Sequence, residues 1–176
     1  MTNTTAPAID LTELITQTST ALSSADTDAA TVRFGVQATL AAGTNTQVEI
    51  TAGKHEFTID EPPALGGENV GANPVEHLLA ALAACQVITV KVWAAKLGLA
   101  VDDVKVELAG PIDLRGFLGV DADVRPGFGQ IEVTTRILGP EPAEAYDELI
   151  RKVEAHCPVL DNLTAGVPVR TTITAG

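Results

Sequence analysis

The sequence predicts an α+β fold in which antiparallel β-sheets pack with two helices. Its strand-like segments come in runs, because several alternating stretches precede a long apolar helix and others flank a second helix. A strict alternation of single strands and helices, typical of a doubly wound parallel sheet, is absent from the pattern. With 176 residues and 45% apolar content, the chain is long enough for one domain with a core and too apolar for general disorder.

Residues 1–28 are rich in Thr, Ala, Ser and Asp, and we interpret them as an N-terminal extension before a domain at 29–176. Leu11, Leu14 and Leu22 recur at roughly helical spacing, which predicts a short helix within the extension. The start of the chain has no basic segment followed by an apolar run, the pattern of a secretory signal. We therefore expect a cytoplasmic protein.

Strands are predicted wherever apolar and polar residues alternate. Three such segments follow the extension and form a meander: 32–38, 48–50 and 57–59. Three more lie further along the chain: 101–108, 130–138 and 167–174. The last of them alternates Val167, Val169, Thr171 and Ile173.

The segment from Pro74 to about Leu97 is predicted as a long helix. Asn73 can serve as its N-cap, Pro74 suits the first helical position, and the charge of Glu76 suits the N-terminal end of the helix dipole. Gly98 is a natural residue to end the helix. The helix is apolar nearly all round, with a few polar interruptions such as Gln86. This composition predicts burial within protein rather than a membrane span.

A second helix is predicted over about 142–155, where apolar residues form one stripe and charged residues occupy the rest. It should end before Pro158, because the residue before a proline is pushed out of helical geometry. The following segment, PVLDNL, could begin another short helix and direct free backbone N–H groups at the sulfur of Cys157.

Charge and motifs exclude several classes of function. The formal net charge of −12 disfavours binding to nucleic acid or to an anionic membrane, because both need clustered Lys and Arg. The sequence contains no phosphate-binding loop and no GxSxG motif. Its three histidines lack the spacing of a zinc site, so we expect neither a metal nor another cofactor.

The two cysteines are the candidates for chemistry. Cys85 lies in the middle of the apolar helix, where a structural role is the commoner one for a free cysteine. A reactive thiol there would need a cation from another element, because Lys91 lies six positions on and far round the helix. For Cys157, at the end of the second helix, a redox role and simple space filling are equally compatible with the sequence.

Two stretches resemble motifs of the OsmC/Ohr family. GANPVEHLLAALAACQVITV is similar to the central helix of that family, and AHCPVLDNLTAGVPVRTTI is similar to its second-cysteine motif. Together with the strand pattern, the resemblance covers about residues 31–174. It implies an intertwined homodimer with two long central helices between β-sheets, and reduction of organic hydroperoxides.

The resemblance also implies roles for four residues. Cys85 would attack the peroxide, Cys157 would close a disulfide with it, and Arg33 with Glu76 would keep the first thiol ionised. Arg115 and Arg125 are alternatives to Arg33. Many members of the family carry their glutamate directly after Asn-Pro, whereas this chain has Val75 there and its acid one step later.

Helix geometry limits what Glu76 can do. Nine positions separate Glu76 from Cys85, which corresponds to about 13 Å along a helix and to opposite faces. Glu76 would therefore act through an arginine or from a partner subunit. Capping of its own helix is the simpler alternative.

The implied reaction converts Cys85 to a sulfenic acid and then to a disulfide with Cys157. An external dithiol, of the dihydrolipoyl or thioredoxin-like kind, would reduce that disulfide. Phe117, Leu118 and Phe128 on a Gly-rich loop favour bulky apolar hydroperoxides over hydrogen peroxide. The alternative function is a non-catalytic dimer that binds small molecules or serves a structural role.

Overall fold

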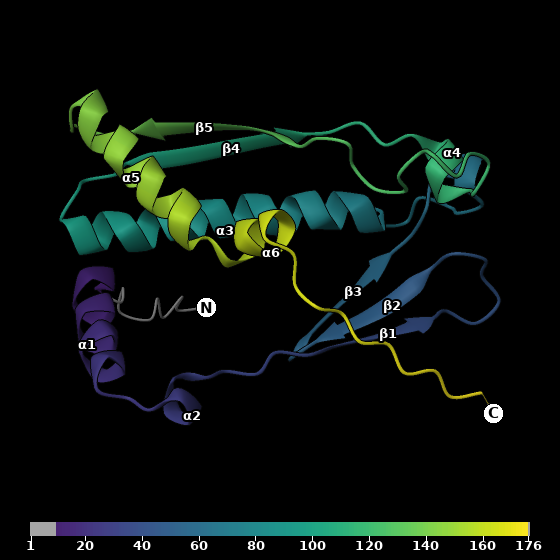
Figure 1. The fold of residues 1–176 in the computed structure, drawn as a ribbon, viewed down its shortest axis with the longest axis horizontal. Coiled ribbons are helices and arrows are strands. Elements are labelled where there is room, and N and C mark those ends of the chain that lie inside the picture. The colour runs from purple at the N-terminus through teal and green to yellow at the C-terminus, as the bar shows by residue number, and fades with distance from the viewer. Residues whose placement is uncertain (1–9, 176) are drawn as a thin grey trace, which may run out of the picture. The chain divides into compact units, whose positions relative to one another are not determined.

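The computed structural model describes residues 10–175, which form helices and antiparallel sheets, so the predicted α+β class is confirmed. The chain divides into two compact units, residues 1–81 and 82–176, and each is described by itself (Figure 1). One long helix, α3 (Pro74–Leu97), runs from the first unit into the second.

The first unit opens with two helices, α1 (Leu11–Ser23) and α2 (Thr27–Ala30). Each begins at an aspartate whose carboxylate accepts a hydrogen bond from a backbone N–H three residues on: Asp10 from Glu13 and Asp26 from Ala29. The short helix predicted in the extension is therefore confirmed. None of the residues of α1 is buried.

A three-stranded antiparallel sheet follows, made of β1 (Val36–Leu40), β2 (Val48–Ala52) and β3 (His55–Ile59) in that order. The prediction that the first strand begins at residue 32 is wrong. Val36 pairs with the last residue of β2, and β2 then turns back through Gly53, whose φ of 62° is left-handed. Residues 32–35 consequently have no β2 residue opposite them.

The loop that leads to α3 contains the 3-10 turn η1 (Pro63–Leu65) and is organised by the buried carboxylate of Asp60. This carboxylate accepts hydrogen bonds from the Thr46 hydroxyl and from the backbone N–H groups of Glu61, Glu68 and Val70. Burial by itself would raise the pKa of Asp60, but these hydrogen bonds outweigh burial and lower it.

Helix α3 begins as the sequence predicts. The backbone N–H of Asn73 donates to the Glu76 carboxylate at 2.8 Å, and the N–H of Glu76 donates to the Asn73 side chain at 2.9 Å. The helix ends before Gly98, whose φ is 68°. By length and composition alone α3 could cross a membrane, a test that core helices of soluble proteins also pass. Two of its residues, Val90 and Ala94, belong to a buried core.

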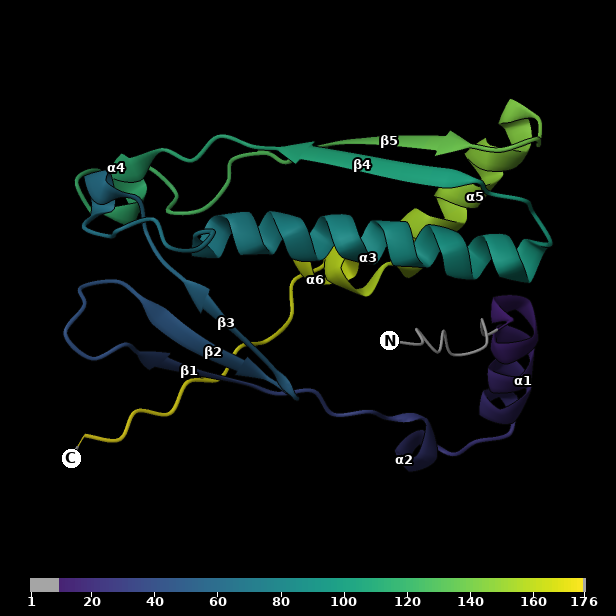
Figure 2. The ribbon, with the colours of Figure 1, turned by 180° about the vertical axis from the view of Figure 1, so that it is seen from behind.

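The second unit contains β4 (Asp103–Ala109) and β5 (Glu132–Leu138), an antiparallel pair joined by a long loop with the short helix α4 (Leu114–Phe117). Helices α5 (Ala143–His156) and α6 (Pro158–Thr164) follow, and Figure 2 shows the same elements from behind. The core of this unit is made of Val90, Ala94, Val101, Leu149 and Val153.

The strand predicted at 167–174 is absent from the described part of the chain. These residues form no regular secondary structure, and Val169 and Ile173 are 84% and 86% exposed. A strand requires a neighbour that accepts and donates its backbone hydrogen bonds. Alternation in the sequence indicates a face that can be buried, but it does not supply the neighbouring strand.

Candidate active site

The sulfur atoms of Cys85 and Cys157 face each other in the second unit. The Cys157 thiol donates a hydrogen bond to the Cys85 sulfur at 3.1 Å, and both cysteines are free. A disulfide bond is about 2.05 Å long, so this contact is non-covalent. The two sulfurs nevertheless need only a small movement to form one.

The position of Cys157 follows from the proline after it. Pro158 cannot continue α5, so the chain leaves the helix after His156, and Cys157 adopts extended backbone angles. Pro158 then occupies the first position of α6. The backbone N–H groups of Val159 and Leu160 hydrogen-bond to the Cys157 sulfur, as the sequence predicts for a helix that begins there.

The two thiols differ in accessibility and in proton affinity. Cys157 is completely buried, whereas Cys85 is half-buried. Burial raises the pKa of the Cys157 thiol and the hydrogen bond to Cys85 raises it further, although the N–H groups of Leu160 and Val159 act in the opposite direction. Cys157 therefore keeps its proton and donates a hydrogen bond to the sulfur of Cys85. Cys85 is the sulfur that a reagent from solvent can reach.

Glu76 and Arg33 lie in the first unit, outside the unit that holds both sulfurs. The carboxylate of Glu76 caps α3. Capping is the simpler of the two roles predicted for Glu76, the other being support of the cation at the thiol. Arg33 is exposed in the irregular segment before β1. A direct role for either residue at the thiols remains a prediction.

The alternative cation Arg115 is already engaged. Its guanidinium makes a two-pronged pair with Asp113, with donor to acceptor distances of 2.6–3.1 Å, and lies 3.7 Å from Asp121. Hydrogen bonds from Arg115 lower the pKa of the Asp113 carboxyl to about 2. Arg125, by contrast, makes no ion pair with any residue that the structure describes.

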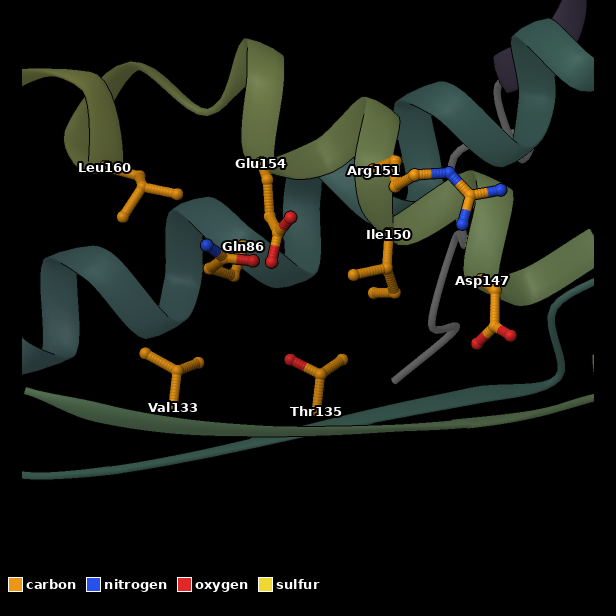
Figure 3. Close-up of a pocket in the computed structure, with 8 residues that line it drawn as sticks. All are labelled: Gln86, Val133, Thr135, Asp147, Ile150, Arg151, Glu154 and Leu160. Carbon is orange, nitrogen blue, oxygen red and sulfur yellow. The ribbon is translucent and has the colours of Figure 1, made fainter. Parts of the chain in front are cut away.

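A cavity of about 460 Å³ lies in the second unit (Figure 3). Its lining comes from α3, β5, α5 and α6: Gln86, Val133, Thr135, Asp147, Ile150, Arg151, Glu154 and Leu160. Gln86 directly follows Cys85 and is only 4% exposed. In the sequence, the one signal of this residue is that it interrupts an apolar helix with a polar side chain. Residues 10–175 contain no cluster of His, Cys, Asp and Glu that could hold a metal ion.

The fold and the paired thiols define a class of small α+β proteins in which a cysteine in the middle of a long helix meets a second cysteine at the end of another helix. The family of OsmC-like proteins matches residues 66–172, more than half of the chain. The chain therefore belongs to the OsmC-like protein family. Comparison with curated proteins gave no match.

Solved structures of the family share this fold. The OsmC-like protein of Mycoplasma pneumoniae is 20% identical, with a TM-score of 0.65 over 76% of this chain and 88% of that one. The organic hydroperoxide resistance protein OsmC of Legionella pneumophila is 24% identical, with a TM-score of 0.57 over 77% and 91%. An organic hydroperoxide resistance protein of Elizabethkingia anophelis, with thiocyanate bound, is 26% identical, with a TM-score of 0.56 over 77% and 90%.

Proposed function

We propose that this protein is a thiol-dependent peroxidase that reduces organic hydroperoxides. The supporting observation is the 3.1 Å contact between one half-buried and one fully buried cysteine. Because only Cys85 can be reached from outside, it is the sulfur that would meet the peroxide. Similarity to organic hydroperoxide resistance proteins also supports a peroxidase function.

In the proposed reaction the Cys85 thiolate attacks the outer oxygen of the hydroperoxide. The O–O bond breaks, the alcohol leaves after gaining a proton, and Cys85 becomes a sulfenic acid. The Cys157 sulfur then attacks the Cys85 sulfur, its proton leaves with the hydroxyl as water, and a disulfide forms. Peroxide is reduced by two electrons and the two thiols are oxidised by two.

The disulfide must be reduced from outside, because the chain has no third cysteine. We propose an external dithiol of the dihydrolipoyl or thioredoxin-like kind, which would attack the more accessible sulfur of Cys85. The reaction would take place in the cytoplasm.

We also propose that the protein works as a homodimer in which Arg33, supported by Glu76, provides the cation for Cys85. Large apolar side chains are exposed in this single chain, among them Phe34 at 89% and Val169 at 84%. Exposed apolar surface of this kind marks association sites. A second copy of the chain would cover it.

We propose bulky apolar hydroperoxides as the substrates. Phe117 and Leu118, on the loop between β4 and β5, are 58% and 61% exposed, so they are free to contact an apolar substrate. An apolar ligand gains free energy when such side chains cover it.

The decisive experiment measures hydroperoxide consumption with dithiothreitol as the reductant. We expect the wild type to consume cumene hydroperoxide faster than hydrogen peroxide, and Cys85→Ser to consume neither above background. Cys157→Ser should turn over briefly and then stop, because its sulfenic acid is not protected by a disulfide. Equal slow rates in all three proteins would contradict the peroxidase.

Equal slow rates would instead favour the second candidate function, a non-catalytic dimer that binds small molecules. The observation in favour of that candidate is the cavity between α3, β5, α5 and α6, with the buried residue Gln86 in its lining.

A further inference from the structure

The hydrogen bond between the two sulfurs has a direction. Cys157 is its donor and Cys85 is its acceptor, at a distance of 3.1 Å. Cys85 is held within the continuous helix α3, and Cys157 is held at the N-cap position of α6. Regular secondary structure therefore fixes the backbone on both sides of the contact and keeps the donor next to the sulfur that solvent can reach.

Burial determines which sulfur keeps its proton. Cys157 is completely buried, and burial is the largest of the causes that raise its pKa. Cys85 is half-buried, so a negative charge on its sulfur keeps part of its contact with water. When one of the two thiols ionises, the difference in burial favours loss of the proton from Cys85 and its retention on Cys157.

A hydrogen bond of this kind stabilises the ionised state of its acceptor. A thiolate carries a full negative charge, so it accepts hydrogen bonds more strongly than a neutral thiol does. The S–H group is a weak donor, which limits the size of the effect. The Cys157 side of the contact is closed to bulk water, however, and a hydrogen bond to a charge is stronger where the surroundings screen it less. The thiol of Cys157 therefore favours a thiolate at Cys85 from within the same unit.

We propose that Cys157 activates Cys85, because the hydrogen bond from its thiol stabilises the Cys85 thiolate before a peroxide arrives. Cys157 then acts twice in the proposed reaction, first as a hydrogen-bond donor and later as the sulfur that closes the disulfide. The proton that it keeps in the first role is the proton that leaves with the hydroxyl as water in the second. The catalytic part of this inference rests on the proposed peroxidase function, whereas the ionisation of Cys85 does not.

Two substitutions of Cys157 separate activation from disulfide formation, because neither variant can close the disulfide. Cys157→Ser keeps a hydroxyl that can donate to the Cys85 sulfur, and serine suits the N-cap position before α6. Cys157→Ala removes the donor. Each variant retains Cys85 as its single cysteine, so every reaction with a thiol reagent reports on this sulfur.

The first measurement is the rate at which iodoacetamide alkylates Cys85 in the full chain as a function of pH. The thiolate is the reacting form: its sulfur forms a bond to carbon and iodide leaves. At neutral pH we expect Cys157→Ala to react about threefold to tenfold more slowly than Cys157→Ser, the effect of one lost hydrogen bond. In strongly alkaline solution Cys85 is ionised in both variants, so their rates should become equal.

The second measurement is the loss of the free Cys85 thiol after addition of cumene hydroperoxide. We expect the same order, with Cys157→Ser reacting faster than Cys157→Ala. A difference in alkylation without any reaction with the hydroperoxide would support activation of Cys85 and contradict the peroxidase function, so the two proposals can fail separately.

Two outcomes would overturn the activation of Cys85 by Cys157. One is equal alkylation of the two variants at neutral pH. The other is a difference that persists in strongly alkaline solution, because it would reflect access to the sulfur rather than ionisation. Val153→Ala in the Cys157→Ser protein is the packing control, since it removes buried carbon atoms and keeps the hydroxyl. Thermal unfolding shows whether Cys157→Ala is folded, and Cys157→Val, which also lacks a donor, replaces it if it is not.

Discussion

The thiol of Cys157 donates a hydrogen bond to the sulfur of Cys85 at 3.1 Å, and Cys157 is completely buried. The pair is therefore asymmetric, because one sulfur can meet reagents and the other can meet only its partner. We expect a single equivalent of hydroperoxide to remove both free thiols of the wild type within one chain. Mass spectrometry after alkylation measures this loss.

The same asymmetry predicts the behaviour of Cys157→Ser. Its Cys85 should stop at the sulfenic acid and pass to the sulfinic acid with excess peroxide, because no second thiol intercepts it. In Cys85→Ser, Cys157 should remain reduced, since it is buried and keeps its proton. Rapid oxidation of Cys157 in that variant would contradict the assigned order of attack.

Stability should fall in alkaline solution because of Cys157. Burial raises its pKa in the folded state above the ordinary value of 9.0, so the unfolded chain loses this proton first as pH rises. The stabilisation is fully present below the ordinary pKa and is lost between that value and the folded one, by up to about 1.4 kcal/mol per pH unit. Urea unfolding of the reduced protein from pH 7.5 to 10 measures it, and Cys157→Ala should show a shallower decline.

Glu76 should contribute to stability through the helix cap. Glu76→Ala removes the hydrogen bond to the Asn73 N–H and should lower the free energy of unfolding by about 1 kcal/mol, whereas Glu76→Gln can keep that bond. Urea unfolding compares them, with Glu148→Ala as an exposed helical control.

The two Glu76 variants also test its catalytic role. If the charge of Glu76 supports the cation at Cys85, Glu76→Gln should consume hydroperoxide about tenfold more slowly while remaining nearly as stable as the wild type. An undiminished rate would restrict Glu76 to capping.

Arg33→Ala tests the proposed cation at Cys85. We expect slower alkylation of Cys85 by iodoacetamide at neutral pH, because a thiolate without a nearby positive charge is less populated. Lys54→Ala removes another exposed cation of the same unit and serves as the control. Equal alkylation rates in both variants would remove Arg33 from the site.

Asp113 should titrate far below an ordinary aspartate. Its pKa is about 2, because hydrogen bonds from Arg115 favour the ionised carboxyl, so its contribution to stability is present above the ordinary value of 3.8 and is lost as pH falls toward 2. NMR of the side-chain carboxyl carbon measures the titration. Arg115→Gln should return the pKa toward 3.8, and Arg125→Gln should leave it low.

Local signals in the sequence determined most of the elements. The start of α3 is determined by Asn73, Pro74 and Glu76, and its end by Gly98. The end of α5 is determined by Pro158. These signals can be recognised in the sequence because caps and prolines act within a few residues along the chain. The two cysteine motifs were enough to indicate the family.

Only the tertiary structure decided which residues meet. The pairing of Val36 with Ala52 set the start of β1, and no described neighbour completes a strand at 167–174. Packing of α3 with α5 and α6 brings Cys85 to Cys157 across 72 positions, and it places Gln86, a polar interruption of the helix, in the lining of a cavity. The physical reason is that spacing along a chain determines the faces of a helix or strand, whereas contact, burial and the pKa of a thiol depend on what the fold packs against that face.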